Sequence, residues 1–114
     1  MRMYSVFRTQ KFDKELAKSL SKVEQEEVEN FEKKQLANNP YVGDPLGYKF
    51  FREKKVGGKR IYYLIYDDLK AVLMIGISDK KTQQETIDQI KIHLSDYYSI
   101  IKEVIKRHGE SDHV

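Results

Sequence analysis

The sequence of 114 residues contains no cysteine, which excludes disulfides, thiolate zinc sites and cysteine nucleophiles. The lack of cysteine also fits a reducing compartment, so we expect a protein of the cytoplasm. No apolar run is long enough to cross a bilayer, and none follows the charged amino terminus, so we expect neither a membrane span nor a signal peptide. The length has room for one ordinary domain, and we expect residues 1–114 to form it.

Histidine is scarce. His93, His108 and His113 are far apart along the last part of the chain, and this spacing suggests neither a metal cluster nor a histidine dyad. We therefore expect no metal and no cofactor.

The charge is concentrated in one segment. The whole chain carries a net charge of +3, but the segment from Lys49 to Arg60 holds six basic residues and one acid, Glu53, for a net +5. The rest of the chain is therefore slightly acidic. Such a patch suits an anionic partner, namely a phosphate backbone, ribosomal RNA or an acidic protein segment. The alternative is that these basic residues only make an edge hairpin more soluble. The charge alone does not decide between the two interpretations.

The first third of the chain predicts a strand followed by helices. Residues 4–9 are rich in strand formers and predict a short first strand. From Phe12 to Leu36 apolar residues recur at steps of three to five, which predicts two amphipathic helices broken around residues 19–21. Asn38-Asn39-Pro40 ends this α-hairpin, because the residue before proline is driven out of the helical region.

The middle and the end of the chain predict a sheet followed by a helix. Residues 49–56 and 59–66 are expected strands joined by a tight turn at Gly57-Gly58, and residues 71–78 form a nearly continuous apolar strand. Residues 84–107 return to helical spacing, with a bend or a new helix at Ser95-Asp96 and an end at Gly109. We expect residues 95–114 to be a C-terminal helical extension with a frayed tail. The predicted fold class is α+β, with an N-terminal strand, an α-hairpin, a three-stranded antiparallel meander and a C-terminal helix.

Three stretches of the sequence resemble the RelE/ParE toxin superfamily, and ParE-like toxins most of all. These are the Gly43-Asp44-Pro45-Leu46 loop after the α-hairpin, the hairpin "FREKKVGGKRIYY" that starts at Phe51, and the buried strand that ends in "ISDKK" at Lys81. The resemblance covers the chain from Tyr4 to about Leu94. It implies the toxin of a type II toxin–antitoxin pair. RelE-like members cleave messenger RNA on the ribosome, whereas ParE-like members poison DNA gyrase.

Ribonuclease chemistry without a metal needs a group that stabilises the charge of a pentacoordinate phosphate. Arg60 is our first candidate, because a guanidinium offers planar, bidentate donors and stays charged, and the resemblance places an arginine here. Lys54 and Lys55 stand across the hairpin from Lys59 and Arg60, and alternation allows only one of the two to share the face of Arg60. Similarity to relatives favours Lys55, but Lys54 stays open. One of these lysines could serve as general base, and docking of phosphate or antitoxin without catalysis is the alternative.

Lys80 and Lys81 end the buried strand, where some RelE-like enzymes carry a basic catalytic residue. We expect Lys81 to be catalytic and Lys80 to bind nucleic acid. The tyrosine that follows this position in RelE-like ribonucleases has no match between Thr82 and Ile87. Its loss removes a proton carrier or stacking platform and favours the ParE-like alternative.

The remaining expected nucleic-acid contacts lie on the same hairpin: Arg52, Lys59 and Tyr62. Alternation sends Tyr62 and Tyr66 to one face of their strand and Tyr63 to the other, and for most of these tyrosines a core position is the safer interpretation. Glu53 and Asp44 could act as bases, but pairing with the nearby lysines is the more frequent role of such acids.

The sequence thus predicts a toxin of the RelE/ParE fold, expected to be a metal-independent, ribosome-associated mRNA endonuclease that inhibits translation. The alternatives are a ParE-like gyrase poison and a non-catalytic module that binds RNA or an antitoxin. The expected partners are a cognate antitoxin, the ribosome and messenger RNA, with a dimer of toxin–antitoxin heterodimers as an expected assembly. The prediction depends on a cluster of cations that converge around Arg60 into a hollow for a phosphodiester.

Overall fold

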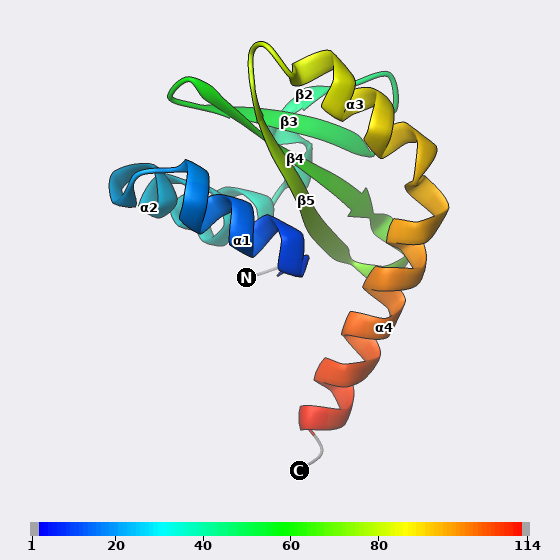
Figure 1. Ribbon diagram of the computed structural model, residues 1–114. Coiled ribbons are helices and arrows are strands. Elements are labelled where there is room, and N and C mark those ends of the chain that lie inside the picture. Colours follow the sequence, from blue (N-terminus) through cyan, green and yellow to red (C-terminus); the bar gives the residue numbers. More distant parts are fainter. Residues whose placement is uncertain (1–2, 113–114) are drawn as a thin grey trace.

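The computed structural model describes residues 3–112, with side chains for residues 3–108. A five-stranded sheet in the order β1-β5-β4-β3-β2 forms its centre (Figure 1). The strands are β1 (Ser5–Arg8), β2 (Asp44–Pro45), β3 (Phe51–Val56), β4 (Lys59–Tyr66) and β5 (Ala71–Asp79). The α-helices are α1 (Gln10–Ser19), α2 (Lys22–Asn30), α3 (Gln83–Ile92) and α4 (Leu94–Asp112). Three short helical turns complete the chain: η1 (Phe31–Leu36), η2 (Pro40–Val42) and η3 (Asp67–Leu69).

The sheet is mixed. β2, β3, β4 and β5 pair antiparallel, which confirms the predicted meander, while β1 pairs in parallel with the start of β5. β5 lies between β1 and β4, and its residues from Ala71 to Ser78 are all buried. Its nearly continuous apolar sequence follows from this position, because a central strand covered on both faces has no solvent side.

Two hydrophobic cores lie on the two faces of the sheet. α1 and α2 cover one face through Phe12, Leu16 and Val28, and α3 and α4 cover the other through Ile87, Ile90 and Ile101. Figure 1 shows this arrangement, with the β3–β4 hairpin extending from the sheet on the same side as α2. The α+β class and the order of the main elements are therefore as predicted from the sequence.

The α-hairpin owes its shape to caps. The Thr9 side chain accepts a hydrogen bond from the Phe12 N–H at the start of α1, and Ser21 and Glu24 form a capping box at the start of α2. A Ser or Thr cap followed by a reciprocal Glu stabilises a helix start. The break falls at Leu20, inside the predicted interval. After α2 the helix continues as a π-helical segment, η1, which the sequence pattern did not separate from it.

Four boundaries differ from the prediction. β3 begins at Phe51 rather than at Lys49, and the short strand β2 was not predicted. The last helix breaks at His93, whose backbone leaves the helical region, two residues before the predicted bend at Ser95. α4 then runs through Asp112, so Gly109 does not end it. Residues 113 and 114 of the predicted frayed tail lie outside the described residues.

Within the described residues, no helix combines the length and apolar character needed to span a membrane.

Candidate functional site around Arg60

Arg60 is the second residue of β4, just after the tight turn of the β3–β4 hairpin. The strand register places it directly opposite Lys55 on β3 and Ser78 on β5. Residues directly opposite one another in a sheet share a face. Tyr62, two residues along the same strand, belongs to the core under α3 and α4, so Arg60 and Lys55 lie on that face, near the start of α3.

The Arg60 guanidinium is held by one carboxylate and is otherwise unbonded. Its side chain is 12% exposed, and Nε lies 3.8 Å from Glu53 Oε2. Nε is buried and has no hydrogen-bond partner among the described residues. A 3.8 Å ion pair is too long for a hydrogen bond. The buried Nε is out of reach of a ligand, so an anion such as a phosphate would have to be bound through the Nη groups at the end of the guanidinium.

Glu53 is a buried carboxylate that is fixed from the other side. Its residue exposure is 3%, and the side-chain amide of Gln83 donates to Oε1 at 2.7 Å and to Oε2 at 3.0 Å. Gln83 is the first residue of α3. The start of α3, the middle of β3 and Arg60 are therefore joined in one polar arrangement, which we call the Glu53 cluster: Glu53, Arg60 and Gln83.

Tyr62 lies in the core and not on a surface. It is fully buried, and its hydroxyl is 2.7 Å from Ser78 Oγ. Burial is the main cause that raises the pKa of its phenol, and the Ser78 hydrogen bond opposes it. A ring without exposed area cannot stack on a base, so the expectation that Tyr62 contacts nucleic acid does not fit this structure, and the core position considered for the tyrosines holds for it.

Not all of the predicted cations share the face of Arg60. The register settles the open choice within the hairpin: Lys55 is opposite Arg60, whereas Lys54 is opposite Ile61. Lys54 therefore lies on the other face, where its Nζ is 5.4 Å from the ring centroid of Phe31. Lys59 is next to Arg60 in the strand and lies on that other face as well, opposite Asp79.

Arg52 has a structural role on the same far face. Its guanidinium donates to the backbone carbonyls of Lys49, Tyr41 and Gly43. These bonds tie the segment before β3 to the strand and use the donors that a nucleic acid would need. The structure thus gives a different use for Arg52 than the expected nucleic-acid contact.

Lys80 and Lys81 are exposed in the short loop between β5 and α3. The loop is shaped by Asp79, whose Oδ1 accepts hydrogen bonds from the Thr82 N–H at 2.9 Å and from the Thr82 hydroxyl at 3.0 Å. These bonds hold the pKa of Asp79 below its usual value. Both lysines are therefore carried by a loop that starts beside Ser78, the β5 neighbour of Arg60.

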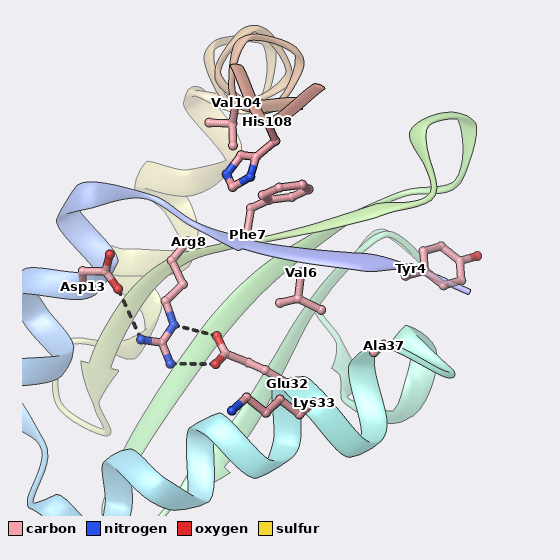
Figure 2. A pocket seen from close by; sticks show the side chains of 10 residues that line it. All are labelled: Tyr4, Val6, Phe7, Arg8, Asp13, Glu32, Lys33, Ala37, Val104 and His108. Atoms are coloured by element: carbon pink, nitrogen blue, oxygen red, sulfur yellow. Dashed lines mark hydrogen bonds and ion pairs between the residues drawn. The ribbon is translucent and has the colours of Figure 1, made fainter. Parts of the chain in front are cut away.

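The sequence predicted a hollow around Arg60, but in the described part of the chain Arg60 lines none of the five best-formed hollows. One hollow of about 400 Å³ lies at the outer edge of β1 (Figure 2). There Arg8 forms a bidentate ion pair with Glu32, with Nε to Oε2 at 2.8 Å and Nη2 to Oε1 at 2.6 Å. The hydrogen bonds that Arg8 donates to Glu32 raise the pKa of Arg8. This ion pair connects β1 to η1. The Arg8 guanidinium is hydrogen-bonded to Glu32, unlike that of Arg60.

Sequence reasoning did not identify Gln83 and Ser78 as members of the site. They lie 23 and 18 positions after Arg60, and neither residue type nor local spacing marks them. The register of β4 with β5, which includes a bulge between Tyr62 and Tyr63, brings Ser78 opposite Arg60, and the docking of α3 brings Gln83 to Glu53 beside it.

Comparison with known proteins shows relatives in structure only. No family model matches the chain, and no curated protein matches it. A chain of the RelBE2 toxin–antitoxin complex from Mycobacterium tuberculosis is 25% identical, with a TM-score of 0.59, over 70% of this chain and 94% of that chain. A mutant of the E. coli toxin RelE in the free state is 18% identical, with a TM-score of 0.63, over 79% of this chain and 99% of that chain. An archaeal RelE–RelB complex from Pyrococcus horikoshii OT3 is 18% identical, with a TM-score of 0.50, over 68% of this chain and 96% of that chain.

These similarities span nearly the whole of each relative but leave at least a fifth of this chain outside the match. They agree with the mixed sheet flanked by an α-hairpin and later helices. The chain therefore has the fold of the RelE toxins.

Proposed function

We propose that this chain is the toxin of a type II toxin–antitoxin pair and that it cleaves messenger RNA on the ribosome, in the cytoplasm. One observation carries the nuclease part. On a RelE-like fold, Arg60 presents a guanidinium that is positioned by Glu53 but makes no hydrogen bond to the described residues. An oriented guanidinium with unbonded donors is suited to a phosphate that gains charge during a reaction.

The proposed reaction uses the 2′-hydroxyl of the message as the nucleophile. The 2′-oxygen loses its proton to a base and bonds to the adjacent phosphorus, the bond from phosphorus to the 5′-oxygen breaks, and that oxygen takes up a proton. The products are a 2′,3′-cyclic phosphate and a 5′-hydroxyl. Arg60 stabilises the added charge on the phosphorus-bound oxygens, and Lys55, opposite it, adds a second cation. Lys80 and Lys81 supply further cations from the neighbouring loop.

The test is incubation of the purified chain with translating ribosomes, followed by mapping of the 5′ ends of the message. The wild type should produce new ends, and Arg60→Ala should remove them, with a loss of at least 100-fold if one preorganised donor group is lost. Lys14→Ala, which removes an exposed cation on α1, is the matched control and should cleave as the wild type does. Intact message with the wild type, or ends that persist in Arg60→Ala, would reject the nuclease.

A ParE-like gyrase poison is the second candidate. The observation in its favour is that no tyrosine follows Lys81 before Ile87 and that the tyrosine nearest Arg60 in its strand, Tyr62, is buried. A nuclease of this fold would then have to work without an aromatic platform at that position. Growth arrest with double-strand DNA breaks and unbroken message would select the gyrase poison.

The proposed partner is a cognate antitoxin, because two of the similar structures are complexes of a toxin with an antitoxin. A dimer of toxin–antitoxin heterodimers is the corresponding assembly. Expression without the partner should arrest growth. Harmless expression, together with binding of RNA or of the antitoxin, would instead favour a non-catalytic module.

A further inference from the structure

A second concentration of cations lies at the opposite end of the sheet from Arg60. There, where β4 ends and β5 begins, four basic side chains lie over three tyrosine rings. The pairs are Lys49 and Arg52 over Tyr41, Lys70 over Tyr4, and Lys91 over Tyr48, with distances of 5.1 to 5.8 Å to the ring centroids. Tyr4 and Tyr41 belong to the side of α1 and α2, and Lys91 comes from α3 on the other side. Phe50, which stacks on Tyr48 and packs against both cores, lies between them, and we call these residues together the ring–cation surface. Six residues of β4 separate the two ends, which is about 20 Å at the rise of a strand.

Tyr48 is the exposed ring of this surface. It is 45% exposed and stacks on Phe50, with centroids 5.0 Å apart and planes at 28°. A tyrosine that only fills a core would be buried, as Tyr62 and Tyr63 are. Tyr48 instead presents part of a flat ring at the surface, already aligned on a second ring, and Lys91 from α3 reaches toward it.

The segment that carries Tyr48 is held rigidly. The Leu46 N–H donates to the Phe51 carbonyl at 2.9 Å, and the Phe51 N–H donates to the Tyr48 carbonyl at 3.2 Å. The three hydrogen bonds of Arg52 to backbone carbonyls fix the segment further. A ring that is already ordered loses little conformational entropy when a ligand binds.

The charge of the surface is positive. Lys49, Lys70 and Lys91 are exposed, and the carboxylate that lies within the surface, Asp67, is occupied by the hydroxyls of Tyr4 and Tyr41. Asp67 keeps its negative charge and interacts with Lys70 and Lys49, so four cations less this one acid leave these residues with a net charge of +3. Lysine side chains are long and flexible, so an ammonium that rests over a ring can turn to a phosphate when a base takes its place on the ring.

We propose that the ring–cation surface binds single-stranded RNA, with a base stacked on Tyr48 and phosphates bound by Lys49 and Lys91. Exposed aromatic rings beside cations are the features that bind single strands without reading their sequence. An acidic peptide would satisfy the lysines but would leave the Tyr48 ring without a flat partner. The inference rests on the proposed function, because it takes the message as the ligand, and it places a second contact about 20 Å from the bond that is cut.

The test measures the affinity of the Arg60→Ala chain for a fluorescently labelled single-stranded RNA decamer by anisotropy, at several salt concentrations. Tyr48→Ala should weaken binding roughly tenfold, as expected for the loss of one stacked base, and Tyr48→Phe should retain it. Replacement of both Lys49 and Lys91 by alanine should reduce the slope of log K against log salt by about 1.4, since each phosphate contact on a single strand contributes about 0.7.

A matched pair exists on α4. Lys102 Nζ lies 5.5 Å from the ring centroid of Tyr98, which is 37% exposed. Tyr98→Ala and Lys102→Ala remove a similar ring and a similar cation and should leave RNA binding unchanged. The proposal is overturned if Tyr48→Ala, shown to be folded by its thermal melt, binds RNA as tightly as its parent. It is also overturned if Tyr98→Ala weakens binding equally, or if a decamer of glutamate binds the surface more tightly than the RNA.

The two proposals fail in different ways. If the Tyr48 variants bind RNA as tightly as their parent, while the wild type cuts message on ribosomes and Arg60→Ala does not, the surface proposal fails and the nuclease stands. If the Tyr48 variants lose RNA binding but the wild type leaves message on ribosomes intact, the surface stands and the nuclease fails.

Discussion

Gln83→Ala provides a direct test of the Glu53 cluster. Gln83 donates to both oxygens of a carboxylate that is 3% exposed, and its removal leaves Glu53 with Arg60 at 3.8 Å as its remaining ion-pair partner among the described residues. Hydrogen bonds to charged groups contribute about 1.5–3 kcal/mol. Gln83 is itself half-buried, so water can replace part of the loss, and we expect the free energy of unfolding to fall by about 2 kcal/mol.

The neighbouring residue supplies the control. Gln84 is exposed and donates to Asp88 four residues later on the surface of α3. Gln84→Ala should change the free energy of unfolding by less than about 0.5 kcal/mol. Urea unfolding of both variants measures the difference, and a thermal melt should show Gln83→Ala lower by about 8 °C at this chain length.

A second background isolates the contact. In a chain that carries Glu53→Leu, Gln83→Ala should cost less than about 0.5 kcal/mol, because the carboxylate that it served is gone. Equal costs of Gln83→Ala and Gln84→Ala in the native background would refute the reasoning. So would a cost of Gln83→Ala that is the same with and without Glu53.

Three further predictions concern the hairpin and the opposite end of the sheet. Lys55→Ala should slow message cleavage roughly tenfold, equal to about 1.4 kcal/mol of activation free energy, as measured by the rate at which 5′ ends appear. Gly57→Ala should lower stability to urea by about 1–2 kcal/mol, because Gly57 has a φ of +60° and a Cβ there would meet the Glu24 carboxylate. Hydrogen bonds from two tyrosines lower the pKa of Asp67. The stability that its charge provides is therefore present above pH 3.8 and is lost as the pH falls through the lowered pKa. Asp67→Asn should remove this loss, so the free energy of unfolding should fall less steeply at acid pH.

Each of these predictions has a counterpart that should behave differently. Lys54→Ala, on the opposite face of the same strand, should slow cleavage less than twofold, and equal effects of the two lysines would contradict the register argument. Gly58→Ala should be nearly neutral, because nothing lies within 4 Å of a Cβ at that position. If the wild type and Asp67→Asn lose stability in parallel between about pH 4 and pH 2, the hydrogen bonds from Tyr4 and Tyr41 do not stabilise the ionised form.

Local patterns in the sequence sufficed for most elements of the fold. Strand β4 was predicted with its observed ends, since Gly57-Gly58 and Asp67-Asp68 bracket an alternation of apolar and aromatic residues. The break between α1 and α2 was predicted around residues 19–21, and the structure has a capping box that begins at Ser21. The break at His93 was predicted two residues too late, at Ser95, because no proline or glycine marks it.

The site was harder to predict than the fold. The alternation of side chains along a strand allowed only one of Lys54 and Lys55 to lie on the face of Arg60. Which of them does so depends on the strand register across the turn, and the two glycines of the turn do not determine that register. The convergence of many cations on one hollow was not found, because Arg52, Lys54 and Lys59 lie on the other face of the sheet. Gln83 was missed because its partner, Glu53, is 30 positions away and only the docking of α3 brings them together.

The pairing of β1 with β5 has a consequence for how the chain is made. Ser5 has its partner at Ala71, 66 positions later, so the first strand to leave the ribosome stays without its neighbour until most of the chain has been synthesised. Contacts of such long range form slowly and late. The helix that carries Gln83 comes later still, so Arg60 acquires its surroundings only after α3 has been synthesised. Under the proposed function, a nascent copy would therefore stay harmless to the ribosome that makes it until α3 has emerged.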